Sequence, residues 1–384
     1  MAVLEVQPMQ TSGDALAKLL AAARARRGEF AANQQISADV VELLKSAGVY
    51  RACVAKRFGG DEVSPSEFLR LIEKISAADG STGWVASFGV SAMYLASLPV
   101  ETQAQMYAGG PDSIFSGMIF PPQPAIPVEG GLEVSGRWSW GSGSTGADYI
   151  GVGIKVDGGS DTGGLPLVAV MPAERVRIER NWDVIGLKGT GSHDVVVDKV
   201  VVPREWTFVR GAKPNLDGPL YRYPAMSLAA QVLAVVALGV GRAAIDELLA
   251  YAGGRTSITG APVLADRANV QTDLARAEAQ LRSARAFFYE ATDDAYATLQ
   301  KGDPVSVQQQ AMLRLAASHA ARVGEDVTYA VYRMSGTSGI FENHPVAHYL
   351  RDALIVPQHA FLADGTFQSV GKVLFGLTPP PGFP

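Results

Sequence analysis

The sequence predicts an α+β fold in which a helical segment, a β segment and a second helical segment follow one another. Apolar residues recur at helical spacing over residues 12–110 and again over 224–336. Short runs of alternating residues, punctuated by Gly and Pro, fill residues 113–209 instead. A chain of 384 residues is too long for one ordinary core, so we expect three units, over residues 1–112, 113–218 and 219–384.

The first unit has the pattern of a series of amphipathic helices. One helix is expected around Leu16 to Leu20, and a second contains Val40 to Leu44 and stops at Gly48. Two more are expected over 66–77 and 82–98. The run PSEF provides the start of the third helix, because Ser and Pro are common at helix N-termini.

The middle unit is expected to be a compact antiparallel β-barrel or sandwich. Its strands are predicted at LEVSGRWSW (132–140), DYIGVGIKV (148–156), LPLVAVM (165–171) and HDVVVDKVVV (193–202). The last unit then returns to helical patterning. Long helices are expected over 224–253, 262–301 and 304–336, followed by a helix over 345–376 that is broken or kinked near Pro357.

Composition excludes several classes of protein. A net charge of -5 provides no basic stripe for a nucleic-acid backbone. Cys53 is the single cysteine, which excludes an internal disulfide or a cysteine-rich zinc site and fits a cytoplasmic protein. The N-terminus lacks signal-peptide features, and the apolar window 229–241 is shorter than the roughly 20 residues that span a bilayer. We therefore expect neither nucleic acid nor membrane as a partner.

Two motifs of other enzyme classes can also be set aside. His344 and His348 have the four-residue spacing of a zinc site, but Pro345 makes this a helix start and no glutamate follows in the zincin pattern, so no metal is expected. No Rossmann glycine fingerprint opens a βα unit. The chain is therefore not expected to bind NAD(P)H itself.

Three stretches carry a resemblance to a known family. They are GLKGTGSHDVVVDKVVVP (186–203), GGRTSITGAPVLAD (253–266) and RDALIV (351–356). In this order and spacing they resemble the acyl-CoA dehydrogenase superfamily. The resemblance implies an N-terminal helical domain, a middle β-barrel and a C-terminal four-helix bundle. It also implies a homotetramer with a flavin held between barrel and bundle.

The stretch from Arg351 to Gly365 separates two chemistries within that superfamily. An acyl-CoA dehydrogenase needs a carboxylate to remove a proton from its substrate, and in many members a glutamate stands eight residues after the Asp of Arg-Asp-Ala. Here that position is Ala360, and the nearest acid, Asp364, is expected to face elsewhere. Because some members carry the base on another helix, an acyl-CoA dehydrogenase or related flavin oxidase with bound FAD stays an alternative.

The segment WSWGSG (138–143) and His359 resemble another branch, the oxygenase component of two-component (group D) flavin-dependent aromatic monooxygenases. This branch implies reduced flavin and O2 as co-reactants, and a separate NAD(P)H-dependent flavin reductase as partner. It forms a flavin hydroperoxide that survives where water is excluded. The resemblance implies that Ser142 hydrogen-bonds the adjacent flavin nitrogen and that His359 holds the peroxide and exchanges a proton. Trp140 and Gly143 would contact the flavin.

Each of these assignments has a structural alternative. His359 could be a hydrogen-bonded histidine at a helix junction, and Ser142 could simply end a strand in a turn. Trp138 and Trp140 alternate, so they are expected to share one strand face, which favours barrel packing. A catalytically silent binding subunit is a third interpretation of the chain, and the intact Arg255, Arg351 and SGTSG run (335–339) argue against it.

The substrate is expected to be a small aromatic compound, phenolic or indolic. Trp84, Ser91, Ser116 and Phe361 resemble positions that line the substrate pocket of this branch, although core packing explains some of them equally well. Where some phenol hydroxylases present a histidine, this chain has GVSAMY (89–94), which argues against a simple phenol.

Two segments are candidates for the flavin phosphates. Arg255 matches an arginine that in relatives reaches the phosphates of a neighbouring subunit. The run MSGTSGIF (334–341) supplies small residues and backbone amides at a helix end, namely Ser335, Gly336, Thr337 and Ser338. FMN and FAD are both compatible with these segments, and reduced FMN is expected because the superfamily's usual adenine-contacting pattern is not clear in this chain.

Overall fold

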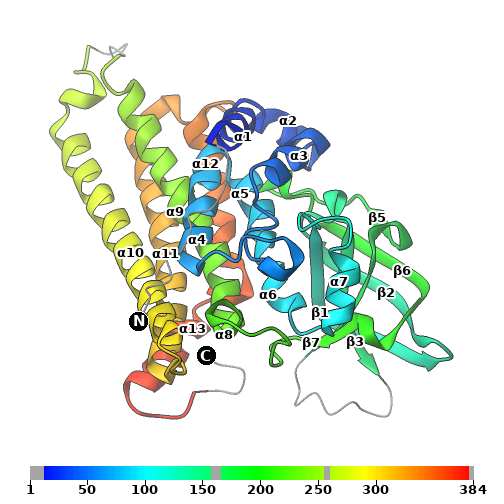
Figure 1. The fold of residues 1–384 in the computed structure, drawn as a ribbon. Helices are drawn as coiled ribbons and strands as arrows, with labels where there is room; N and C mark the ends of the chain where they lie inside the picture. Colours follow the sequence, from blue (N-terminus) through cyan, green and yellow to red (C-terminus); the bar gives the residue numbers. More distant parts are fainter. Residues whose placement is uncertain (1–12, 157–165, 255–259, 380–384) are drawn as a thin grey trace.

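The computed structural model describes residues 13–156, 166–254 and 260–379. Helices from both ends of the chain pack together in one layer, and the strands form a sheet beside them (Figure 1). The expected order of helical, β and helical segments is confirmed. The unit boundaries after residues 112 and 218 stay predictions.

In the described residues, the helices before the sheet are short. They are α1 (Gly13–Ala25), α2 (Arg27–Asn33), α3 (Ala38–Ser46), α4 (Pro65–Ala78), α5 (Gly80–Ala86), α6 (Ala92–Leu95) and α7 (Val100–Met106). α4 begins with a capping box in which Ser64 and Glu67 satisfy each other's backbone amides. The prediction of one continuous helix over 82–98 is wrong, because a 3₁₀ turn over Ser87–Ser91 separates α5 from α6. Gly89 lies in that turn, where a Cβ would come within 2.4 Å of the Val49 carbonyl oxygen, so close packing determines the local path.

The described strands form one sheet in the order β5-β6-β2-β1-β3-β4-β7. They are β1 (Phe115–Val128), β2 (Gly131–Gly141), β3 (Tyr149–Val156), β4 (Leu167–Pro172), β5 (Arg177–Glu179), β6 (His193–Val202) and β7 (Thr207–Val209). The four predicted strands correspond to β2, β3, β4 and β6. Their inner faces build a separate core around Trp138, Val152 and Val195.

The prediction of a closed antiparallel barrel is wrong in two respects. β5 and β7 are open edges of the described sheet, and each has only three residues with which to pair. β1 and β3 run parallel, with Phe115 opposite Tyr149. This happens because β2 returns on one side of β1, and the chain then crosses back to start β3 on the other side.

After the sheet, three long helices dominate the described chain. The helices here are α8 (Pro219–Arg222), α9 (Ala225–Tyr251), α10 (Ala268–Gln300), α11 (Val307–Ser335), α12 (Pro345–Ile355) and α13 (Gly365–Leu374). The predicted break near Pro357 is confirmed, since 3₁₀ turns over Val356–Gln358 and Ala360–Leu362 separate α12 from α13.

α9 is the central helix of this layer. It is long and apolar enough to cross a membrane, but 94% of its most apolar window is buried inside the protein. α11 approaches it closely at Gly324, where a Cβ would lie 2.5 Å from the Ala237 carbonyl oxygen. The interpretation of residues 229–241 as a buried helix is therefore confirmed.

Candidate active site

A chain of hydroxyl groups runs from the loop before β6 to the end of β2. Thr190 Oγ1 donates to the Leu187 carbonyl oxygen at 2.9 Å and lies 2.7 Å from Ser192 Oγ. Ser192 Oγ lies 2.6 Å from Ser142 Oγ. All three hydroxyl-bearing residues are buried. Ser142, proposed from sequence, is therefore the last member of a network whose other two members, Thr190 and Ser192, lie in the 186–203 motif but were assigned no role there.

The direction of each hydrogen bond in this chain of hydroxyl groups follows from the bond between Thr190 and the Leu187 carbonyl oxygen. Because Thr190 gives its proton to a carbonyl oxygen, it must accept the proton of Ser192. Ser192 must in turn accept the proton of Ser142. Ser142 Oγ also accepts a hydrogen bond from Trp84 Nε1 at 3.3 Å. One lone pair on Ser142 Oγ is left. Ser142 can therefore accept a hydrogen bond from a further group but cannot donate one.

The structure brings five of the predicted site residues together at this point. Trp84 on α5 donates to Ser142, and its ring centroid lies 6.0 Å from that of His359. Ser116 on β1 donates to the Ser142 carbonyl oxygen at 2.8 Å. The Phe361 ring is 5.0 Å from the His359 ring. Residues far apart in the sequence thus meet where the sheet adjoins the helices.

His359 is a neutral imidazole in this setting. Its Nδ1 atom accepts a hydrogen bond from the Phe361 backbone amide at 3.2 Å, so its proton stands on Nε2. Burial, with the positive charge of Arg210 as a second cause, lowers the pKa of His359 to about 4. The imidazole can therefore donate from Nε2 throughout the neutral pH range.

No carboxylate takes the place of the missing glutamate in this segment. Ala360 is exposed, and Asp364 points to solvent, where its side chain is 85% exposed and pairs with Arg322 at 3.1 Å. The expectation that Asp364 faces elsewhere is confirmed.

Arg210, at the end of β7, is a site residue that sequence reasoning missed. Its Cζ atom lies 4.9 Å from the Tyr94 ring centroid and 5.3 Å from that of Phe361. It belongs to no motif, so only the packing of β7 against α6 and the 360–362 turn could reveal it.

Trp138 and Trp140 do not share a strand face, and that prediction is wrong. Trp138 is fully buried in the sheet core, whereas Trp140 is 67% exposed. A β-bulge between Trp138 and Gly141 inserts one extra residue opposite β6, and Trp140 takes a positive φ of 63°. The bulge turns the indole of Trp140 outward beside Ser142.

This arrangement fits a flavin ring. The exposed indole belongs to Trp140, two residues before Ser142, whose Oγ atom has the acceptor lone pair. Gly143 follows with a positive φ of 71°, and its backbone amide donates to the Thr190 carbonyl oxygen at 2.9 Å. Ser144 Oγ, close by, is buried with no hydrogen-bond partner among the described residues. Ser91 is also buried, but no side-chain hydrogen bond of the described residues joins it to this group, and its role stays a prediction.

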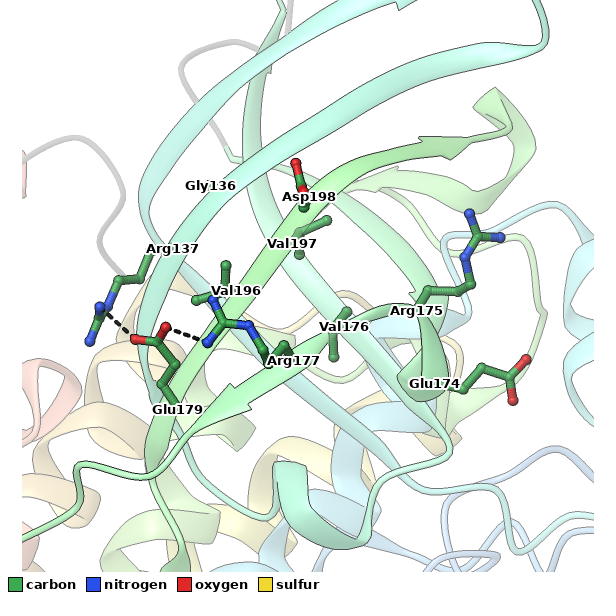
Figure 2. Close-up of a pocket in the computed structure, with 10 residues that line it drawn as sticks. All are labelled: Gly136, Arg137, Glu174, Arg175, Val176, Arg177, Glu179, Val196, Val197 and Asp198. Carbon is green, nitrogen blue, oxygen red and sulfur yellow. Dashed lines mark hydrogen bonds and ion pairs between the residues drawn. The ribbon is translucent and has the colours of Figure 1, made fainter.

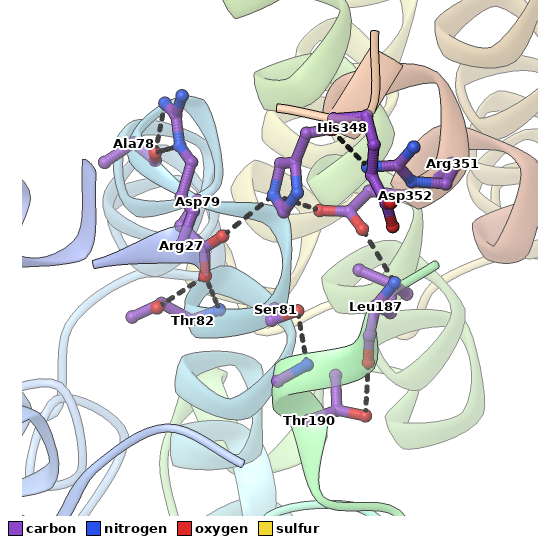
Figure 3. Close-up of polar contacts among 12 residues, drawn as sticks. Arg27, Ala78, Asp79, Ser81, Thr82, Leu187, Thr190, His348, Arg351 and Asp352 are labelled. Atoms are coloured by element: carbon purple, nitrogen blue, oxygen red, sulfur yellow. Dashed lines mark hydrogen bonds and ion pairs between the residues drawn. The ribbon is translucent and has the colours of Figure 1, made fainter. Parts of the chain in front are cut away.

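A buried charged triad lies behind the hydroxyl chain (Figure 3). His348 Nε2 lies 3.3 Å from Asp79 Oδ1 and 3.2 Å from Asp352 Oδ2. Asp79 caps α5 by accepting from Thr82, and Asp352 accepts from the Leu187 amide at 2.7 Å. The triad therefore ties α4 and α5, the loop before β6, and α12 together.

Gly186 shows how close these parts approach. A Cβ at this position would lie 1.9 Å from the Arg351 carbonyl oxygen, so only glycine fits between the loop and α12. This explains why the loop sequence begins with Gly next to Leu187, which itself adopts a positive φ of 50°. The hydroxyl chain starts from the loop that this contact positions.

The charges of the triad stabilise one another. Burial alone would lower the pKa of His348, but the charges and hydrogen bonds of Asp352 and Asp79 outweigh burial and raise it to about 10. Burial alone would raise the pKa of Asp79, and the hydrogen bond and charge of His348 hold it below its usual value. The three ligand atoms lie within 4.8 Å of one another, a metal-like spacing, yet the ion pairs and hydrogen bonds already account for them.

His344 takes no part in this triad. It caps α12 by accepting from the Val346 amide at 3.3 Å, and its ring packs edge-on against Tyr251 at 5.3 Å. The zinc-like spacing of His344 and His348 therefore does not bring the two imidazoles to one site.

The 335–338 turn, one of the two segments predicted to bind the flavin phosphates, precedes α12 in the chain. Arg255 lies outside the described residues. Ser335 ends α11 and donates to the Tyr332 carbonyl oxygen at 2.6 Å, and a 3₁₀ turn over Gly336–Ser338 follows, with Gly336 and Thr337 exposed. The contact of Tyr251 with His344 shows that the end of α9 approaches the same region. Their role in phosphate binding stays a prediction.

A groove of about 690 Å³ lies elsewhere, on the β5 and β6 side of the sheet (Figure 2). Charged side chains form its polar rim. Among them, the exposed Arg137 and Arg177 both form ion pairs with Glu179. None of its lining residues belongs to the group around Ser142 and His359. We assign it no part in the site.

The chain is similar to known proteins over almost its whole length. Residues 231–364 match the family described as "Acyl-CoA dehydrogenase, C-terminal domain". An indole-3-acetate monooxygenase from Pseudomonas putida is 55% identical over 94% of this chain and 92% of its own length. An oxygenase subunit of a flavin-dependent monooxygenase from Rhodococcus jostii is 28% identical over 89% of this chain and 92% of its own length.

Solved structures give the same result for the fold. The crystal structure of 3-HSA hydroxylase from Rhodococcus sp. RHA1 superimposes with a TM-score of 0.89 at 26% identity, covering 96% of this chain and 97% of the other. The likeness extends over the helical layer and the sheet together.

Proposed function

Because this chain belongs to the flavin-dependent aromatic monooxygenases of the acyl-CoA dehydrogenase superfamily, we propose that it hydroxylates an indole with an acidic side chain, of the indole-3-acetate type. It would act as the oxygenase component of a two-component system. The co-reactants are reduced flavin, for which we propose FMN, and dioxygen. A separate NAD(P)H-dependent flavin reductase would supply the reduced flavin.

The acceptor lone pair on Ser142 carries this proposal. The central ring nitrogen of a flavin bears a proton when the flavin is reduced and none when it is oxidised. Since the hydroxyl chain leaves Ser142 Oγ able only to accept, it suits the reduced form. The outward indole of Trp140 would lie against the same ring.

His359 supplies the second polar group. Reduced flavin, when bound, provides the electrons with which dioxygen is activated so that one oxygen atom enters the substrate and the other leaves as water. His359 holds a proton on Nε2 and can donate a hydrogen bond to an oxygen atom without itself carrying charge. Trp84 and Phe361, buried or half-buried beside it, exclude water.

The substrate class is proposed from the relatives and from the pocket. The 55% identical relative is named for indole-3-acetate, and so is a relative from Acinetobacter baumannii at 48% identity. The aromatic side chains of Trp84 and Phe361 at the His359 end suit a flat apolar ring. The predicted contacts of Ser91 and Ser116 with the substrate belong to this proposal.

The remaining partners are proposals as well. The exposed apolar side chains of Ile340, Phe341, Leu374 and Phe375 are suited to contacts between copies of the chain and support a homotetramer. Flavin phosphates would bind at Arg255 and at the 335–338 turn. Arg255→Ala should then weaken flavin affinity by about 1–3 kcal/mol, measured by titration with reduced FMN and FAD in parallel. A cytoplasmic location also stays a prediction.

The test of the function is a coupled assay. Purified protein, a flavin reductase, NADH, FMN and indole-3-acetate should consume dioxygen and yield a product heavier by one oxygen atom. The alternative is an acyl-CoA dehydrogenase, which would hold oxidised FAD and bleach on addition of an acyl-CoA. Bleaching by acyl-CoA with no oxygenated indole would refute the proposal.

The hydroxyl chain has its own test. Ser192→Ala frees Ser142 to donate its proton elsewhere, so the variant should lose part of its preference for reduced over oxidised flavin. Thr328→Val removes a buried hydroxyl on α11 that donates to the Gly324 carbonyl oxygen and takes no part in the hydroxyl chain, and it serves as the control. An unchanged ratio of the two dissociation constants in Ser192→Ala would show that the chain does not select the reduced form.

A further inference from the structure

Arg210 brings a positive charge to the aromatic group around His359. Its guanidinium carbon lies 5.3 Å from the Phe361 ring centroid, and the Phe361 ring lies 5.0 Å from the His359 ring. Tyr94 flanks the guanidinium group at 4.9 Å. The charge therefore stands at the edge of the predicted substrate pocket.

Within the described residues, no carboxylate forms an ion pair with Arg210. Its Nε atom is buried and has no hydrogen-bond partner there. The side chain is half-buried, its guanidinium group lies over two aromatic rings, and its one polar side-chain partner among them is the uncharged hydroxyl of Tyr94. A cation in such surroundings is costly unless an anion approaches it.

The surroundings strengthen the positive potential. Arg314 on α11 is buried, lies 5.8 Å from the Phe361 ring centroid and donates to the Phe361 carbonyl oxygen at 3.2 Å. Two guanidinium groups thus contact one aromatic ring. An anionic substrate is favoured at this end of the pocket over a neutral one.

We propose that Arg210 binds the carboxylate of the substrate, so that the acidic side chain lies at Tyr94 and Phe361 while the aromatic ring lies toward Trp84 and His359. The planar guanidinium group can donate two parallel hydrogen bonds, one to each oxygen of a carboxylate. The assignment rests on the proposed function, since it names the residue that recognises an acidic side chain on the indole.

Arg210 lies apart from the 335–338 turn that is predicted to bind the flavin phosphates. That turn follows the C-terminal end of α11, at the top of the helical layer in Figure 1, whereas β7 lies near the bottom of the view. The position of Arg210 beside His359 therefore favours the substrate over the cofactor as its anion.

The experiment compares two substrates of nearly the same shape, one with an anionic carboxylate and one with a neutral amide. Indole-3-acetate and the neutral indole-3-acetamide are assayed with wild type, Arg210→Gln and Arg210→Lys. Arg204→Gln, six positions earlier and exposed, is the control. Arg210→Gln should lower kcat/KM for indole-3-acetate by about 10- to 100-fold, mainly through KM, and change it by less than about 3-fold for indole-3-acetamide.

Binding is measured alongside activity. Calorimetric titration of indole-3-acetate should show the same loss of affinity in Arg210→Gln, partly restored in Arg210→Lys, with unchanged affinity for reduced FMN. Equal losses for both indoles would overturn the assignment, as would weakened FMN binding. If Arg210→Gln fails to fold, the ratio of the two substrates in Arg210→Lys decides, and an unchanged ratio overturns the assignment.

The proposed function and this assignment fail in different ways. A wild-type protein that oxygenates neither indole refutes the proposed function. A wild-type protein that oxygenates the acid and the amide equally well leaves the function standing and refutes carboxylate recognition by Arg210.

Discussion

His348 and His359 belong to the same C-terminal segment, yet their neighbours drive their protonation in opposite directions. Asp352 and Asp79 raise the pKa of His348 to about 10, against the effect of burial. Burial and Arg210 lower the pKa of His359 to about 4. Because the imidazole is the same in both places, the difference lies wholly in the groups that surround it.

The contrast separates a histidine that supports the fold from the one that we propose takes part in the reaction. His348 is a cation locked between two carboxylates that join three parts of the chain. His359 is neutral and has one nitrogen committed to the Phe361 amide, which leaves Nε2 for a ligand. A rigid charged support next to an uncharged donor is what a water-excluding site needs.

Removing the structural histidine should have the largest effect. His348→Ala leaves Asp79 and Asp352 buried without a cation between them, so the free energy of unfolding should fall by about 3–5 kcal/mol, measured by urea denaturation. His319→Ala deletes a half-buried imidazole whose ring contact is with Phe287 and is the control. Similar losses in both variants would show that the triad adds no stability.

The two histidines should also act on opposite limbs of the pH profile of stability. The pKa of His348 is raised on folding, so its contribution, on the order of a few kcal/mol, is complete below pH 6.5 and is lost as the pH rises toward 10. The pKa of His359 is lowered, so its effect is a loss of stability as the pH falls from 6.5 toward 4.

Substitution of either histidine should remove the pH dependence of stability on one side of the profile only. His348→Gln should flatten the alkaline limb and His359→Gln the acid limb, measured as urea midpoints from pH 4 to pH 10. If His359→Gln altered the alkaline limb instead, the two assignments would be reversed.

Loss of His359 should change the reaction more than the fold. His359→Ala should keep folding and flavin affinity nearly intact, while the share of reducing equivalents lost as hydrogen peroxide rises, with product formation down about 10- to 100-fold. Oxygenated product and peroxide are measured together. Gln358→Ala, an exposed neighbour, is the control. Unchanged coupling in His359→Ala would remove it from the mechanism.

The smallest expected effect concerns the cause of the low pKa of His359. Arg210→Met removes the nearby positive charge, so the pKa of His359 should rise above about 4 but stay below 6.5, because burial is the larger cause. Titration followed by NMR of the histidine ring measures it, with Arg204→Met as control. A pKa that does not move would show that burial alone sets it.

Much of the fold could be predicted from local pattern. The four runs of alternating residues became β2, β3, β4 and β6, and the long helices lie close to their expected bounds. The spacing of apolar residues is a local property of the sequence, so it suffices to predict which segments form helices and strands. Closure of the sheet is not local, and the expected barrel failed because the edge strands β5 and β7 are too short to meet.

The site was predictable where a motif marked it. Ser142, Ser116, Trp84 and His359 were recognised by resemblance, and the structure brings them together. Trp140 was misjudged because strict alternation assumes a regular strand, and one inserted residue reverses the face.

What the sequence by itself determined is the order of helices and strands and the identity of the chemical groups: a serine, a histidine and no glutamate near Ala360. Only the tertiary structure decided their states. The direction of the hydroxyl chain depends on a carbonyl at Leu187, and the charge of each histidine depends on residues distant in sequence. Hydrogen bonds and electrostatic fields act through space, so the same imidazole became a fixed cation at one position and a neutral donor at the other.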